Sequence, residues 1–69
     1  MTETQLRSKI AENSGQAEGG VVSTLRLLNT STNINSDVIK QAKRWLQEAV
    51  YLFEENDKLR KELIKLYEI

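Results

Sequence analysis

The sequence predicts an all-α protein whose main element is one long amphipathic helix at the C-terminal end. From Ser36 to Ile69 the chain contains neither glycine nor proline, the two residues least compatible with a helix interior. Apolar residues in this segment recur at alternating intervals of four and three, which is typical of a helix that packs against other helices. A continuous helix over residues 36–69 would be about 50 Å long.

The first 20 residues are expected to form a flexible N-terminal arm or linker. The segment 13–20 is polar and holds all three glycines of the chain, which lose the most backbone entropy on ordering. The pattern Thr2-x-x-Gln5 matches a capping box, so a short helix over residues 3–12 is the alternative for the start of the chain. A helix that short is marginal in water, and we expect it to order only on contact.

Residues 21–69 are expected to form a helical association domain, which begins with a short helix over residues 21–29. Val21, Leu25 and Leu28 fall on one helical stripe, although Val-Val-Ser-Thr at 21–24 also has β propensity. A polar loop follows from Thr30 and leads to a helix start, where Asn35 or Ser36 can act as the N-cap. Asp37 would lie in the first turn, where the helix dipole favours a negative charge.

The long helix carries nine consecutive positions of a heptad repeat, a pattern typical of coiled coils. These positions, called the seam below, are Val38, Ala42, Trp45, Ala49, Leu52, Asn56, Leu59, Leu63 and Leu66. Asn56 is the one polar residue among them, and in a parallel dimer it could pair with its mate and select the register. The alternative is a break in the helix, because Glu54-Glu55-Asn56-Asp57 is a polar run that could form a turn. The pairs Glu54–Lys58 and Asp57–Lys61 favour a continuous helix.

A second apolar strip runs beside the seam and includes Ile39, Leu46, Val50 and Phe53. Two adjacent strips predict that the helix is covered on two sides, once by the segment 21–28 and once by another chain. The predicted partner-binding residues are therefore the nine seam residues together with Leu46 and Phe53. The predicted function is that of a protein–protein interaction module, either self-associating or a small subunit or regulator of a larger assembly. The pattern leaves the partner and the direction of helix packing open.

Composition excludes several classes of function. The chain of 69 residues has no Cys and no His, which removes disulfides, thiol chemistry, imidazole bases and the usual zinc ligands. The acidic residues of the long helix are expected to form a solvated face, so we predict no catalytic residues, no metal site, no cofactor and no enzyme activity. No run of apolar residues is long enough to span a membrane and the N-terminus has no signal-like segment, so we expect an intracellular protein, cytoplasmic or nuclear.

The alternative function is that of a small helical protein associated with nucleic acid. Lys40, Lys43 and Arg44 cluster near the start of the long helix and are candidate phosphate contacts. The segments Val22–Leu28 and Ile34–Ile39, followed by Trp45-Leu46, resemble the first helix, the loop and the start of the middle helix in small histone-fold proteins. The resemblance covers about 25 residues and implies a histone-fold-like or helix-turn-helix protein. After Phe53 the sequence departs from that pattern, since it lacks the long loop that precedes the last helix. The equal number of basic and acidic residues, 10 of each, argues against binding through bulk charge.

Overall fold

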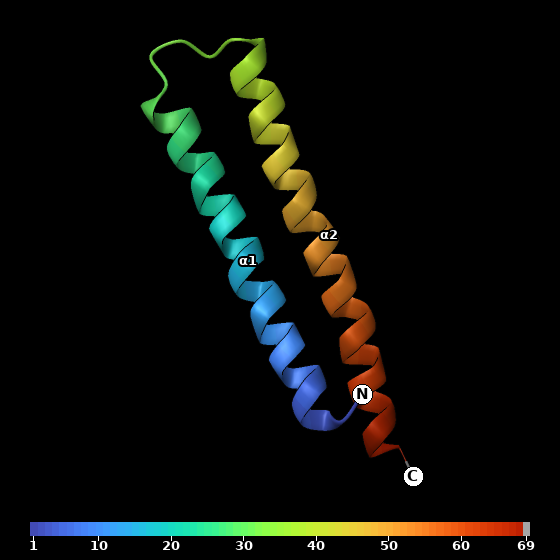
Figure 1. The fold of residues 1–69 in the computed structure, drawn as a ribbon. Coiled ribbons are helices and arrows are strands. Elements are labelled where there is room, and N and C mark those ends of the chain that lie inside the picture. Colours follow the sequence, from blue (N-terminus) through green and yellow to red (C-terminus); the bar gives the residue numbers. More distant parts are fainter. Residues whose placement is uncertain (69) are drawn as a thin grey trace.

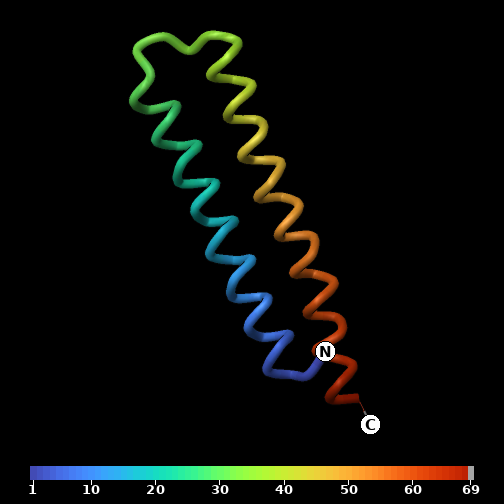
Figure 2. Tube along the Cα trace, in the orientation of Figure 1, coloured from blue at the N-terminus to red at the C-terminus, as the bar shows by residue number. Residues whose placement is uncertain are grey.

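The chain forms an antiparallel hairpin of two long helices in the computed structural model, which describes residues 1–68. Helix α1 spans Glu3–Thr30 and helix α2 spans Ser36–Tyr67, and a short connection at one end joins them (Figure 1). The two helices lie side by side over their full length, and the start of α1 and the end of α2 lie opposite the connection (Figure 2). We call the two ends the loop end and the open end. The molecule measures 56 × 15 × 13 Å. The all-α prediction is confirmed.

Helix α2 follows the sequence pattern closely. Asn35 is its N-cap: the side-chain oxygen accepts the backbone N–H groups of Asp37 at 3.0 Å and Val38 at 3.1 Å. The helix continues without interruption through the polar run at 54–57, where an ion pair joins Lys61 to Asp57 at 3.0 Å. The alternative of a turn at that point is therefore wrong.

The segment that was predicted to be a flexible N-terminal arm is instead part of helix α1. Residues 3–30 form one continuous helix that includes Gly15, Gly19 and Gly20, and the helix expected over 21–29 is only its last part. The capping box at the start is confirmed, with Thr2 accepting the backbone N–H of Gln5 at 3.2 Å and Gln5 accepting that of Thr2 at 2.9 Å. A long first helix leading directly to one long second helix also differs from the short-helix pattern implied by the histone-fold resemblance.

Packing against α2 explains why α1 forms in spite of its glycines. Its buried side chains are those of Leu6, Asn13, Ala17 and Thr24. They belong to a second heptad pattern, which comprises Leu6, Ile10, Asn13, Ala17, Gly20, Thr24, Leu27 and Ser31. Four of these residues are polar or glycine. The heptad spacing is therefore regular, but the apolar stripe that it produces is only weakly hydrophobic. Burial of one face thus outweighs the low intrinsic helix propensity of the segment.

Small residues bring the two helices close together from the middle of the hairpin toward the loop. Ala17, Ala42 and Ala49 are buried there. A Cβ added to Gly20 would lie 3.4 Å from the Trp45 carbonyl oxygen and 3.9 Å from the Ala49 Cβ, so the backbone of α1 approaches α2 directly. The resulting core is thin, with only Leu6, Ala17, Ala42, Ala49 and Leu59 as buried apolar residues within the described part of the chain.

A polar layer fixes the register of the two helices. Asn56 is completely buried, and its Nδ2 donates to the Ile10 carbonyl oxygen at 3.3 Å and to the Ser14 Oγ at 3.1 Å. Asn13, on the same stretch of α1, is also buried. Among the described residues, the Nδ2 of Asn13 and the Oδ1 of Asn56 are left without hydrogen-bond partners. Asn56 therefore pairs with α1 of its own chain, while the antiparallel direction of the helices follows from the short connection between them.

Candidate functional site

Most of the seam is covered by α1, and only part of it remains for a partner. Of the eleven predicted partner-binding residues, four are buried: Ala42, Ala49, Asn56 and Leu59. Four more are half-buried: Val38, Trp45, Leu52 and Leu63. The remaining three, Leu46, Phe53 and Leu66, are exposed. The structure thus separates the predicted set into a hairpin core and a smaller group that is free to contact another molecule.

A groove between the helices at the open end shows which sides of α1 and α2 share one face of the hairpin. Its lining residues are Arg7, Ile10 and Ala11 from α1 and Arg60, Leu63 and Ile64 from α2. Since side chains seven residues apart lie on the same side of a helix, the side of α1 that carries Arg7 also carries Val21 and Leu28. By the same spacing, the side of α2 that carries Arg60 also carries Phe53, Leu46 and Ile39.

Large apolar side chains gather on this face toward the loop end. We call them the apolar face: Val21, Leu25 and Leu28 from α1, and Ile39, Leu46, Val50 and Phe53 from α2. Five of them are substantially exposed, from 42% at Leu46 to 55% at Leu25. Val50 and Leu25 extend the face outward, four residues from Leu46 and from Val21. Exposed apolar side chains that adjoin one another on a monomer usually mark a surface that another molecule covers.

The opposite face of the hairpin is polar. On α2 it carries Gln41, Glu48, Glu55 and Glu62, and on α1 it carries Lys9, Gln16 and Ser23. Tyr51 points to this side, because residues two apart in a helix point in nearly opposite directions and Phe53 lies on the apolar face. Tyr51 is 65% exposed, so it provides an aromatic side chain of similar size outside the apolar face. The two faces of the hairpin therefore differ sharply in chemistry.

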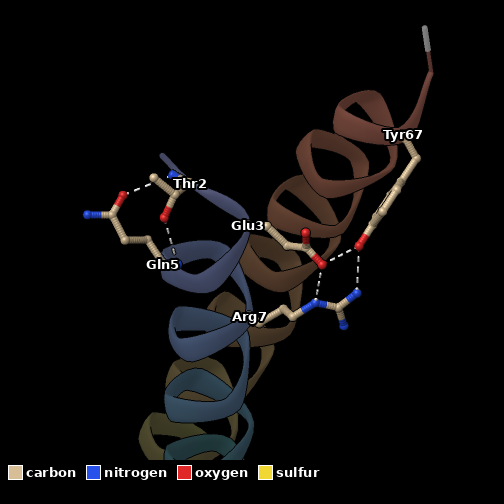
Figure 3. Close-up of polar contacts among 5 residues, drawn as sticks. All are labelled: Thr2, Glu3, Gln5, Arg7 and Tyr67. Atoms are coloured by element: carbon tan, nitrogen blue, oxygen red, sulfur yellow. Dashed lines mark hydrogen bonds and ion pairs between the residues drawn. The ribbon is translucent and has the colours of Figure 1, made fainter.

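A cluster of polar side chains ties the two helices together at the open end. The Tyr67 hydroxyl donates to the Glu3 carboxylate, while Arg7 donates its Nε to Glu3 at 3.0 Å and its Nη2 to the Tyr67 hydroxyl at 3.0 Å (Figure 3). The hydrogen bond from Tyr67, followed by that from Arg7, lowers the pKa of Glu3 below its ordinary value of 4.5. The bonds to Tyr67 and Glu3 in turn raise the pKa of Arg7. These exposed contacts act as a clasp between the first turn of α1 and the last turn of α2.

The candidate phosphate contacts lie on the outward side of α2, where Lys43, seven residues before Val50, borders the apolar face. Lys40, Lys43 and Arg44 are all exposed on the outward side of α2, and Arg44 lies 3.9 Å from Glu48 on the same helix. Over residues 1–68, no group of three potential metal ligands comes together. Neither α1 nor α2 is long and apolar enough to cross a membrane.

Comparison with known proteins gives no relative: no family model, curated protein or solved structure matches this chain.

Reasoning from the sequence alone missed the contribution of α1 to the apolar face. The sequence predicts that the segment 21–28 covers one of the two apolar sides of the long helix, without saying which. By helical spacing from the groove at the open end, Val21, Leu25 and Leu28 fall on the same side of the hairpin as Ile39, Leu46, Val50 and Phe53. The signal that could have placed them correctly is the heptad spacing of α1 between Leu6 and Ser31, because it assigns a different set of residues to the contact with α2.

Proposed function

We propose that this protein is a non-enzymatic helical interaction module whose docking surface is the apolar face. One observation carries the proposal: four large apolar side chains of α2 and Leu25 of α1 are exposed and, by helical spacing, fall on the same side of the hairpin. The seam then serves as the scaffold that holds α1 and α2 in register. The predicted contact with another chain moves from the seam to the surface beside it, where Leu46 and Phe53 lie.

The size of the apolar face indicates how it must be used. Complete burial of a large apolar side chain contributes about 1.5–3 kcal/mol, and these residues are about half buried already. Covering all seven would therefore contribute roughly 5–10 kcal/mol. Association costs on the order of 4–15 kcal/mol in lost translational and rotational freedom. A stable complex thus requires a partner that covers the whole face, which favours a complementary helical surface over a short peptide.

Paired substitutions on the two faces test the proposal. Phe53→Glu places a charge in the apolar face, whereas Tyr51→Glu places the same charge on the polar face of the same helix. We expect Phe53→Glu to abolish association with itself or with another protein, and Tyr51→Glu to leave association intact. The readouts are sedimentation velocity of the purified chain and mass spectrometry of cross-linked complexes formed by the tagged chain in cells. Circular dichroism controls for helicity. Association that survives both substitutions equally would contradict the proposal.

A further inference from the structure

The apolar face continues into a basic end on the same side of the hairpin. Arg7 and Arg60 line the groove at the open end, together with the apolar side chains of Ile10, Leu63 and Ile64. Building on the proposed function, we infer that this side binds one amphipathic helix of another protein. That helix carries an acidic residue where it crosses the two arginines.

Contacts between the helices fix which side chains face one another along this side. Asn56 bonds to Ile10 and Ser14, and Gly20 lies next to Ala49. Since the helices are antiparallel, a step of seven residues forward in α1 matches a step of seven residues backward in α2. Four pairs of side chains, called layers below, therefore line this side from the open end to the loop end: Arg7 with Arg60, Ser14 with Phe53, Val21 with Leu46, and Leu28 with Ile39.

The spacing of the layers suits a single helix as the occupant. Seven residues of a helix rise about 10.5 Å, so the layers recur at the interval at which side chains return to one side of a helix. A third helix lying between α1 and α2 would meet all four layers with one stripe over about 21 residues. An amphipathic helix that lies in an apolar groove is an established mode of recognition. The three layers toward the loop end require apolar side chains in that stripe, because each contains at least one large apolar residue.

The arginine layer sets the charge of the occupant. Arg60 is exposed and has no ion-pair partner among the described residues, since its neighbour Asp57 pairs with Lys61 at 3.0 Å. Arg7 donates from Nε and Nη2 within the clasp, and its Nη1 makes no hydrogen bond to a described residue. A helix that covers both guanidinium groups must supply an acceptor, because a charge removed from water without a partner is costly. A carboxylate matches the planar donors of a guanidinium group, so the stripe carries Asp or Glu at this layer.

A second copy of the chain lacks the required pattern. Both of its helices end this side with an arginine, Arg7 in α1 and Arg60 in α2. With full overlap, its arginines would lie against the arginine layer if the loops were together, and against apolar layers if the loops were apart. The rows just outside the layers carry both signs, with Glu18, Lys43 and Asp57, so they provide no consistent countercharge. A chain that is apolar along three layers and acidic at the fourth fits this side better than a copy of itself.

Synthetic helices test the charge and its position together. Three peptides of about 28 residues, or four heptads, share an apolar stripe over three heptads. In the fourth heptad the same stripe carries glutamate, glutamine or lysine. Each peptide is made with this heptad at either end, so that both directions of the helix are sampled. Fluorescence anisotropy of the labelled, monomeric peptides measures their affinity for the hairpin. We expect the glutamate peptide to bind about tenfold or more tightly than the glutamine peptide, and the lysine peptide to bind most weakly.

Reversal of one charge on the hairpin provides the matched control. Arg60→Glu should invert the order, so that the lysine peptide binds more tightly than the glutamate peptide. Lys65→Glu makes the same change of charge near the open end, but on the polar side of α2, fourteen residues after Tyr51. It should leave the order unchanged. Phe53→Glu should weaken binding of the glutamate peptide by about tenfold or more. Circular dichroism checks that each variant remains helical.

The remaining outcomes separate failure of this inference from failure of the proposed function. Equal affinity of the three peptides, with loss of binding in Phe53→Glu, would overturn the acidic residue and leave the apolar face as a docking surface. A dimer of the chain in sedimentation that excludes the peptides would assign this side to a second copy and overturn the separate helix. The absence of binding by every peptide would also overturn it. The proposed function would then be judged separately, by whether Phe53→Glu removes the complexes cross-linked in cells.

Discussion

Asn13 and Asn56 show how two residues can specify a hairpin at the expense of its stability. Both amides are buried, yet one donor group on Asn13 and the acceptor on Asn56 have no partner among the described residues. An unsatisfied buried polar group costs about 1–3 kcal/mol, whereas replacing both polar partners by apolar ones can be neutral or stabilising. A slipped register would bury these amides against apolar side chains, so they favour one alignment of α1 with α2 over its neighbours.

This account makes opposite predictions for single and double substitutions in the polar layer. Asn56→Ala should lower the free energy of unfolding by about 1–3 kcal/mol, since the Ile10 carbonyl and Ser14 hydroxyl lose their donor. Asn13→Leu combined with Asn56→Leu should raise it, because the layer becomes apolar. Urea denaturation measures both effects, with Gln47→Ala on the exposed side of α2 as the control. If the double variant is less stable than Asn56→Ala alone, the polar layer contributes to stability and not to register.

The clasp at the open end should depend on pH through Glu3. Its pKa is lowered in the folded state, so the carboxylate stabilises the folded form at pH values above its ordinary pKa of 4.5. That contribution is lost as the pH falls below 4.5 and through the lower folded-state pKa. Amide hydrogen exchange in the first turn of α1 should therefore become faster, relative to the middle of α1, as the solution is acidified. Glu3→Gln should remove this pH dependence. An unchanged dependence in Glu3→Gln would assign it to another group.

At the scale of the helices, the glycines of α1 have two different environments. A Cβ added to Gly15 or Gly19 would meet no atom within 4 Å, whereas one added to Gly20 would contact Trp45 and Ala49. We expect Gly15→Ala and Gly19→Ala each to stabilise the protein by about 0.5–1 kcal/mol, because alanine favours the helix and no contact is lost. Gly20→Leu should destabilise it by forcing the helices apart. Thermal unfolding of the three variants checks the contrast. A destabilising Gly15→Ala would mean that α1 is not helical at that point.

The contrast between the two helices also explains how much the sequence could predict. Helix α2 was predictable because several local signals all favour a helix. They are the Asn35 N-cap, the acidic Asp37 in the first turn, the absence of glycine and the eight apolar heptad positions. Helix α1 was not, because three glycines and a polar residue at Asn13 conflict with a pattern that only tertiary packing can favour. For the candidate site, Leu46 and Phe53 were identified from the width of the α2 apolar strip. The contribution of α1 depends on the register of the hairpin, which local sequence patterns do not encode.

At the scale of the whole molecule, the hairpin divides its apolar residues between two tasks. Leu6, Leu59, several small residues and the asparagine layer hold α1 against α2, while large side chains such as those of Leu46, Val50 and Phe53 remain exposed on one face. A partner that covers this face would add to the apolar burial of the hairpin, so association should raise its stability.

Self-association through the apolar face is the alternative to a separate partner, and it predicts that thermal stability depends on protein concentration. Unfolding of a dimer of 69-residue chains, with an enthalpy of about 0.7 kcal/mol per residue, should shift the Tm upward by about 5 °C for each tenfold rise in concentration. Circular dichroism melts between about 1 and 100 µM measure the slope. Tyr51→Glu should keep it, because the polar face takes no part in association. Phe53→Glu should lower the Tm and remove the slope, because the separate hairpins then unfold as monomers. A Tm of the unsubstituted chain that stays constant across this range would show that the hairpin is stable alone and that its core, though thin, suffices.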